Sequence, residues 1–221
     1  MSEPKCNEGE AWYRIYASPE LVKRRRIEHA RKLEQMGLLS ASRDVKILDV
    51  CCGQGEMLDL LAEKGFRFLT GVDRMPEDRL VTTSKERGWE YLSAAVPALP
   101  FEKETFDWIV CAHALHHLGR VDAIRELLSN IFKCLKPGGQ VRIIDHYDSV
   151  QLRLAFSILR SPLASVSAWG KSFRKQLLDE DTYLYDYLRH WPQVRQALEQ
   201  SSFSVKSIRY GLFFFYFLAK K

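Results

Sequence analysis

The segment ILDVCCGQGE, residues 47–56, decides the fold of this chain. It begins as an apolar run of the kind that forms a strand buried on both faces of a sheet. Gly53 and Gly55 follow directly, and a helical pattern begins at Glu56. A strand that leads through a glycine turn into a helix leaves free N–H groups and space for a ligand at the edge of the sheet. The segment therefore predicts a ligand site at a strand–helix turn.

This turn differs from the dinucleotide pattern G-x-G-x-x-G, because the third glycine is missing. The residues after Gly55 are Glu56, Met57 and Leu58. An acidic side chain at the helix start is unfavourable beside a pyrophosphate and suits a ligand that carries an ammonium group. The alternative is that the two glycines only ease packing between the strand and the helix.

Strands and helices alternate from Val45 onward. Apolar runs predict strands at residues 45–50, 66–72, 89–94, 106–111 and 140–145, and helical spacing predicts helices at 56–64, 76–87 and 122–135. Such alternation predicts a doubly wound α/β fold with a parallel sheet. Two further strands, 203–209 and 212–219, are joined by so short a link that they form an antiparallel hairpin.

We expect one domain over residues 1–221, because this length suits a single folded unit. Its expected parts are a helical N-terminal lid (1–43), a ligand-binding core (44–147), an inserted helical substrate cap (148–190), and a last helix with the strand hairpin (191–221). The helix expected over residues 11–40 has one apolar stripe, formed by Leu21, Ile27, Ala30, Leu33 and Met36. Breaks in the later helical region are expected near Ser161-Pro162, at Gly170 and at Trp191-Pro192.

The composition excludes several classes of protein. The chain is 46% hydrophobic and 28% charged, which argues against disorder. The net charge of +5 permits anionic ligands but does not indicate nucleic acid, and the basic run at 23–32 is most simply a solvated helix face. The sequence shows no signal peptide and no apolar run of about 20 residues, so we expect a soluble protein without a membrane segment. Five cysteines without C-x-x-C spacing favour a cytoplasmic location and argue against a metal site.

A carboxylate stands at the end of the second expected strand. Asp73, in GVDRM (71–75), follows the glycine turn at about 20 residues, the spacing of an acid that binds a ribose. The alternative is an aspartate that caps the following helix.

Four segments in this order, ILDVCCGQGE, GVDRM, LPFEKETFDWIVCAHALHHL (99–118) and LKPGGQVRIID (135–145), resemble the class I S-adenosylmethionine-dependent methyltransferases. The resemblance covers about residues 45–145 and implies a mainly parallel seven-stranded sheet that ends in an antiparallel hairpin. It implies S-adenosyl-L-methionine as the cofactor, with its methionine part at the glycine turn and its ribose at Asp73. The residues then expected to bind the cofactor are Asp49, Cys51, Gly53, Gly55, Asp73, Arg74, Met75, Ala95, Val96 and Cys111.

Two positions depart from the usual pattern of that family. Cys51 replaces the first glycine of the turn, and LDVCCG is similar to the turn of some menaquinone-biosynthesis methyltransferases. Ala95 replaces an acidic residue that often binds the adenine amino group. Adenine recognition is therefore expected to use backbone groups such as the Val96 N–H.

The sequence after the fourth strand indicates the kind of acceptor. CAHALHHL (111–118) replaces the Asn/Asp-Pro-Pro-aromatic motif of enzymes that methylate base amines. A histidine at the end of a central strand can deprotonate a hydroxyl or an amine, with a pH–rate limb near neutrality. His117 is the first choice, because related O-methyltransferases place a catalytic histidine there; Asp145 is the expected acidic partner, and His116 and Tyr147 are alternatives. These histidines could also pack or cap a helix, and positioning alone could drive methyl transfer.

The segment 151–178 has basic side chains and no acidic one. Its apolar face comprises Leu152, Phe156, Leu159, Leu163 and Val166. The face is interpreted as a cover of the sheet edge, as a lid with an arginine for an anionic substrate, or as a membrane-surface contact.

The expected function is methyl transfer to an oxygen, a nitrogen or an activated carbon of a small molecule. The sequence does not decide whether this acceptor is anionic or aromatic. Three alternatives remain: a methyltransferase of a quinone-like lipid, an RNA or protein methyltransferase, and a non-catalytic S-adenosylmethionine-binding protein. Salt-sensitive RNA binding would favour the second. The sequence leaves the oligomeric state open.

Overall fold

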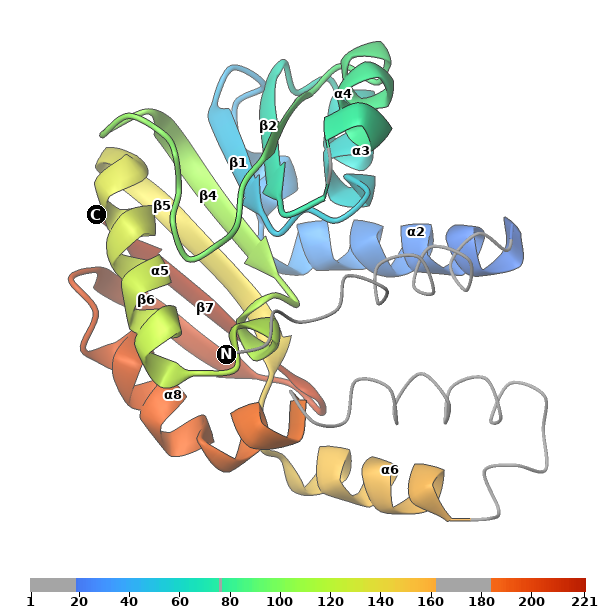
Figure 1. The fold of residues 1–221 in the computed structure, drawn as a ribbon, viewed down its shortest axis with the longest axis vertical. Coiled ribbons are helices and arrows are strands. Elements are labelled where there is room, and N and C mark those ends of the chain that lie inside the picture. Colours follow the sequence, from blue (N-terminus) through green and yellow to red (C-terminus); the bar gives the residue numbers. More distant parts are fainter. Residues whose placement is uncertain (1–18, 76, 162–183) are drawn as a thin grey trace.

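The computed structural model describes residues 19–75, 77–161 and 184–221, and its seven strands form one sheet in the order β3-β2-β1-β4-β5-β7-β6 (Figure 1). The strands are β1 (Lys46–Val50), β2 (Phe68–Asp73), β3 (Glu90–Ser93), β4 (Phe106–Ala112), β5 (Leu135–His146), β6 (Ser204–Tyr210) and β7 (Phe214–Lys220). The first five strands run parallel, and β7 pairs antiparallel with both β5 and β6. The expected mainly parallel seven-stranded α/β sheet with an antiparallel C-terminal hairpin is confirmed.

Helices cover both faces of this sheet (Figure 1). The helices of the chain include α2 (Pro19–Gln35), α3 (Glu56–Glu63), α4 (Glu77–Glu86), α5 (Val121–Cys134), α6 (Val150–Arg160) and α8 (Trp191–Glu199), with 3-10 turns η1 (Leu38–Ser40) and η2 (Leu115–Leu118). Side chains alternate between the two faces of a strand. In β1, Ile47 packs into the apolar cluster of α2 and α3, whereas Leu48 and Val50 pack into the cluster of α5 and α8.

The N-terminal helix differs from the sequence-based expectation. It ends at Gln35, because Gly37 takes a left-handed backbone conformation (φ 68°) and starts the turn η1. Leu33 and Met36 are buried as expected, but Ile27 is 48% exposed, so its assignment to the apolar stripe was wrong. The side chain of Leu21 lies outside the described residues.

β5 is longer than expected. It begins at Leu135 rather than at Gln140, because Leu135 is already extended and pairs with Phe106 of β4. The helix expected to reach residue 135 accordingly ends at Cys134.

The expected cap is described in part. α6 ends at Arg160, immediately before the expected break, and α8 begins at Trp191 with Pro192 in its first turn. Leu152 and Phe156 are buried. Leu163, Val166 and Gly170 lie outside the described residues, and the division at residues 43, 147 and 190 stays a prediction.

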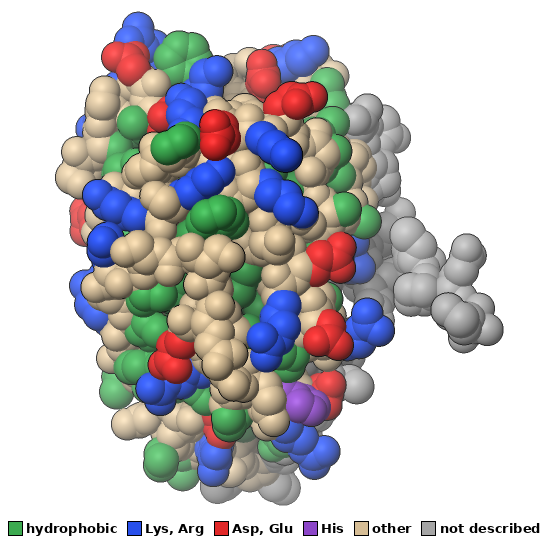
Figure 2. Space-filling model, turned by 90° about the vertical axis from the view of Figure 1, so that its left-hand side faces the viewer, with side chains coloured by type: hydrophobic (Ala, Val, Ile, Leu, Met, Phe, Trp, Pro, Cys, Tyr) green, Lys and Arg blue, Asp and Glu red, His purple; other side chains and the backbone are tan. Residues whose placement is uncertain are grey.

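The surface mixes charges of both signs. On the face drawn in Figure 2, lysine and arginine side chains lie interspersed with aspartate and glutamate. This face therefore lacks the concentrated positive charge that a nucleic-acid surface needs. Among the described residues, no helix has the length and the hydropathy that crossing a bilayer requires.

Candidate functional site

The two glycines of the turn after β1 have different structural roles. Both have left-handed backbones, with φ of 54° at Gly53 and 76° at Gly55. A Cβ atom on Gly55 would overlap the ring of Trp89, so this position needs glycine for packing. A Cβ atom on Gly53 would meet no other atom within 4 Å. Gly55 thus fixes the turn, and Gly53 leaves open space beside it.

Asp73 is held against this turn from the end of β2. Its Oδ2 atom accepts a hydrogen bond of 2.9 Å from the Gly53 N–H. Asp49 lies nearby in β1, and burial together with the negative charge of Asp73 raises its pKa to about 8. The Asp73 carboxylate therefore favours a ligand with a positive charge at this turn, whereas a pKa near 8 keeps Asp49 mainly protonated at pH 7.

The remaining cofactor positions predicted at β2 and β3 surround Asp73. Met75 is buried, and its carbonyl accepts a hydrogen bond of 2.8 Å from the Tyr91 hydroxyl. The peptide N–H of Ala94 donates to the Asp73 carbonyl at 2.8 Å, which brings Ala95 and Val96 to the same edge of the sheet. Arg74 and Ala95 are exposed and Val96 is half-buried, so all three remain candidates for ligand contact.

The cysteines near the turn lie in surroundings that favour the protonated thiol. Burial raises the pKa of the Cys51 and Cys111 thiols, and the nearby Asp49 and Asp145 raise both further. Thiols that stay protonated at neutral pH are poor nucleophiles and poor metal ligands. Among the described residues, no three His, Cys, Asp or Glu side chains are arranged to hold a metal ion.

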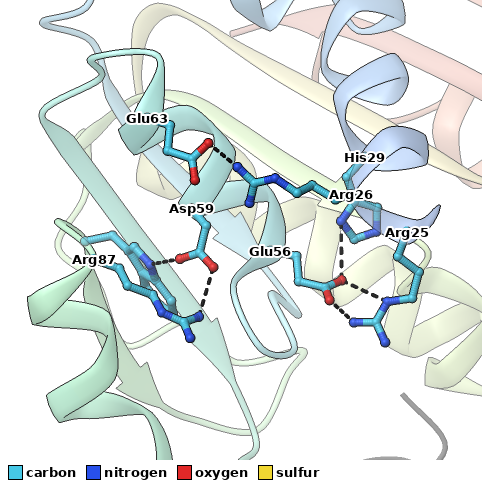
Figure 3. A network of polar contacts seen from close by, with 8 residues as sticks. Arg25, Arg26, His29, Glu56, Asp59, Glu63 and Arg87 are labelled. Atoms are coloured by element: carbon cyan, nitrogen blue, oxygen red, sulfur yellow. Dashed lines mark hydrogen bonds and ion pairs between the residues drawn. The ribbon is translucent and has the colours of Figure 1, made fainter. Parts of the chain in front are cut away.

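Glu56, at the start of α3, is already paired. Figure 3 shows Arg25 of α2 in contact with both of its oxygens, and His29 Nδ1 lies 3.5 Å from Oε2. A second ion pair joins Arg26 of α2 to Glu63 of α3. The expectation that Glu56 attracts the ammonium group of a ligand is therefore not supported, because Arg25 already neutralises its charge.

These pairs also correct the interpretation of the basic run at 23–32. Lys23 and Arg31 are exposed, as a solvated face requires. Arg25 and Arg26 instead hold α2 against α3. This basic run is therefore only partly a solvated face.

Asp145, at the end of β5, is fully buried and organises the turn after β4. Its Oδ1 atom lies 2.7 Å from Nδ1 of His116 and accepts a hydrogen bond from the His146 N–H, also at 2.7 Å. Its Oδ2 atom accepts bonds from the N–H groups of Leu115 (2.7 Å) and His116 (3.3 Å). Burial raises the pKa of Asp145, but the charge and hydrogen bond of His116, together with His113 and His146, lower it, and the net pKa is below its usual range. The partner of this carboxylate is His116, and not the first choice, His117.

His117 is the more exposed of the two neighbouring histidines. Its ring lies 4.1 Å from the His116 ring, measured between centroids. Partial desolvation, and then the charge of His116, lower its pKa to about 4. His117 is therefore neutral at pH 7 and has a lone pair that can accept a proton.

Four residues near Asp145 were not singled out as ligands by the sequence. They are Lys32 of α2, His113 at the end of β4, His146 at the end of β5, and Phe214 at the start of β7. The sequence could have pointed to two of them, because His146 follows Asp145 directly and His113 belongs to the histidine motif. Nothing in the sequence distinguished Lys32 from the rest of the basic run, and no sequence pattern indicated that Phe214 lies at the site.

Tyr147, an alternative candidate in the sequence, has a structural role. Its hydroxyl donates a hydrogen bond of 2.6 Å to the Gly211 carbonyl, in the link between β6 and β7. Its side chain therefore supports the hairpin.

Part of the chain is similar to known methyltransferases. Residues 48–143 match the family model described as "Methyltransferase domain". A demethylmenaquinone methyltransferase of Lactococcus lactis is 31% identical over 124 residues, which cover 52% of this chain and 46% of that protein. A 2-phytyl-1,4-naphtoquinone methyltransferase of Synechocystis is 29% identical over 171 residues, 70% of this chain and 68% of that protein.

A similar fold occurs among solved structures. A SAM-dependent methyltransferase from Aquifex aeolicus aligns with a TM-score of 0.55 and 18% identity, over 87% of this chain and 88% of that one. The chain spans about half the length of several curated relatives that it matches.

Proposed function

Because this chain has the methyltransferase domain and the fold of the class I S-adenosylmethionine-dependent methyltransferases, we propose that it transfers a methyl group from S-adenosylmethionine to a small-molecule acceptor. The acceptor atom is an oxygen, a nitrogen or an activated carbon, and S-adenosylhomocysteine is released. The observation that carries the proposal is the hydrogen bond between Gly53 and Asp73 beside open space. An acceptor panel, assayed for S-adenosylhomocysteine, tests it; no turnover with any acceptor would favour a non-catalytic binding protein.

The turn and the two acidic residues suit this cofactor. When bound, S-adenosylmethionine supplies an electrophilic methyl group on a positively charged sulfur. Gly53 leaves room for the methionine part, and the Asp73 carboxylate, positioned by the Gly53 N–H, accepts hydrogen bonds from the ribose hydroxyls. The negative charge of Asp73, and of Asp49 when ionised, favours the positive charge of the ligand.

The acceptor is proposed to meet the histidines of the turn after β4. His117 is neutral at pH 7, partly open to solvent, and takes the proton that the acceptor loses on attack. His116 and Asp145 are positioning residues, because their mutual hydrogen bond and the bonds to the backbone fix the turn that carries His117.

We expect Asp73→Ala to weaken S-adenosylmethionine binding by roughly 1–3 kcal/mol, since the ribose hydroxyls and the Gly53 N–H lose their acceptor. Isothermal titration calorimetry measures the change. Asp44→Ala, which removes an exposed carboxylate paired with Arg67, is the control and should leave affinity unchanged. An affinity of Asp73→Ala equal to that of the parent would remove Asp73 from the site.

We expect Gly53→Val to weaken cofactor binding by more than Asp73→Ala does. The branched side chain would fill the space beside the turn and would add the strain of a left-handed backbone, about 1–2 kcal/mol. Gly65→Val is the matched control, because Gly65 also has a positive φ (86°) and open space around its Cβ position. Both variants should lose stability, and only Gly53→Val should lose cofactor affinity in the same calorimetric titration. Normal affinity in a folded Gly53→Val would show that the turn does not touch the ligand.

A quinone-like lipid is a second candidate acceptor. The names of the Lactococcus and Synechocystis relatives support it, and so does an exposed apolar ridge on α6. Val150, Leu154 and Ile158 stand one helical turn apart and are 76%, 61% and 55% exposed. Turnover of a prenylated naphthoquinol, compared with that of the same ring without its tail, separates the two acceptors.

RNA and protein acceptors are less well supported. The mixed charges on the face in Figure 2 and the pairing of Arg25 and Arg26 with α3 leave less free basic surface than the sequence suggested. The four described cysteines are free thiols, which suits a cytoplasmic location.

A further inference from the structure

A cation, two imidazoles and one aromatic ring meet beside the catalytic turn, and we call Lys32, His113, His146 and Phe214 the Lys32 cluster. Phe214 is directly opposite His146 in the β5–β7 pairing. Its ring centroid lies 4.7 Å from the His146 ring and 4.9 Å from the His113 ring. Lys32 Nζ lies 5.8 Å from the centroid of the same ring, within the range of a cation–π contact.

The positive charge of Lys32 is only partly compensated by nearby carboxylates. No ion pair joins Lys32 to a carboxylate in the part of the chain that the structure describes. Burial lowers the pKa of Lys32, although the charges of Glu28, Asp145 and Glu56 act to raise it. Asp145 is committed to His116 and to backbone N–H groups, and Glu56 is bound by Arg25. Glu28, on the same helix, compensates part of the charge, but Lys32 is half-buried and forms no ion pair among the described residues, so the site favours an incoming anion.

The two imidazoles of the cluster also have free binding capacity. Within the described residues, Nε2 of His113 and Nδ1 of His146 are buried and have no hydrogen-bond partner. His113 is held in a left-handed conformation (φ 55°), and its N–H donates to the Ile144 carbonyl at 2.8 Å. A residue in such a conformation persists only where surrounding contacts hold it in place, and such residues are frequent at binding sites.

The cluster continues toward His116 and His117. The rings of His146 and His116 are 5.5 Å apart, and those of His116 and His117 are 4.1 Å apart, measured between centroids. A planar molecule on Phe214 would therefore lie next to His146, in the same series of rings that leads through His116 to His117.

We propose that the Lys32 cluster is the acceptor subsite, and that it selects a planar aromatic acceptor with an anionic oxygen, such as a carboxylate or a phenolate. Lys32 pairs with the anion, Phe214 stacks on the ring, and the free nitrogens of His113 and His146 bind the ring's other oxygen substituents. This assignment rests on the proposed methyl transfer for its role, but the binding itself is measured without turnover.

The test compares benzoate with benzamide, a neutral molecule of the same shape. Nuclear magnetic resonance titrations of the parent protein, with and without saturating S-adenosylhomocysteine, give both dissociation constants. We expect benzoate to bind at least about tenfold more tightly than benzamide, the scale of one hydrogen bond to a charged group. Lys32→Met should remove this preference and leave benzamide affinity within about twofold. Lys23→Met, at an exposed position of the same helix, should keep the preference.

A second measurement does not depend on a ligand. The charge of Lys32 lowers the pKa of both His113 and His146, so both imidazole pKa values should rise in Lys32→Met. Equal affinities for benzoate and benzamide in the parent, or a preference that survives in Lys32→Met, would overturn the subsite. Failure of S-adenosylhomocysteine to bind would instead contradict the proposed function, so the two failures are distinguishable.

Discussion

Asp145→Ala should lower the free energy of unfolding by about 3–5 kcal/mol, the cost of removing one partner of a buried charged pair. The substitution leaves the His116 imidazole without its 2.7 Å partner. It also leaves the N–H groups of Leu115, His116 and His146 without the acceptor that they share. Urea denaturation, followed by circular dichroism, measures the loss.

Asp148→Ala is the matched control. Asp148 lies three residues further along and pairs with Arg153, which is exposed, so its removal should cost no more than about 1 kcal/mol. Losses of equal size in the two variants would show that the Asp145 network does not stabilise the fold.

The stabilisation by Asp145 should depend on pH with a definite sign. Its pKa in the folded protein is lowered, so its contribution is complete above the unfolded pKa of about 3.9. The contribution is lost as the pH falls below that value toward the folded pKa. The difference in unfolding free energy between the parent and Asp145→Ala should therefore shrink as the pH falls below about 4. A constant difference down to about pH 3 would contradict this assignment.

His117→Ala should lower turnover by roughly 10²–10⁴-fold if His117 is the general base. Cofactor affinity should be nearly unchanged, because the imidazole is proposed to face the acceptor. The sequence predicted an ascending limb of the pH–rate profile near neutrality. We now expect this limb at lower pH, because the His117 pKa is lowered to about 4. The parent should therefore show an ascending limb near that pH and a flat profile around pH 7, and the variant should lose the limb.

Two further variants make this result specific. His190→Ala, which removes an exposed histidine far along the chain, should keep full turnover. His116→Ala should also lose stability, because Asp145 then lacks its imidazole partner. A loss of turnover that is larger in a folded His116→Ala than in His117→Ala would make His116 the base. If both His116→Ala and His117→Ala keep turnover within a few-fold of the parent, neither histidine is a general base, and methyl transfer depends on the positioning of the two reactants alone.

The sequence by itself determined the sheet and the edge at which we propose that the cofactor binds. The apolar run of β1, the glycine turn and Asp73 are local patterns, and strand–helix alternation brings such ends to one edge whatever the detailed packing. The short link between β6 and β7 required an antiparallel hairpin, because a parallel pair needs a long crossover. These predictions depended on neighbours in the sequence and on the handedness and spacing of regular elements.

Only the tertiary structure decided which charges and rings meet. It paired Asp145 with His116 rather than with His117, and it paired Glu56 of α3 with Arg25 of α2. It also brought Lys32 to Phe214, residues from opposite ends of the chain. Such contacts depend on the docking of α2 and on the β5–β7 register. Local periodicity does not encode them, because packing over the whole fold determines which distant side chains share one buried space.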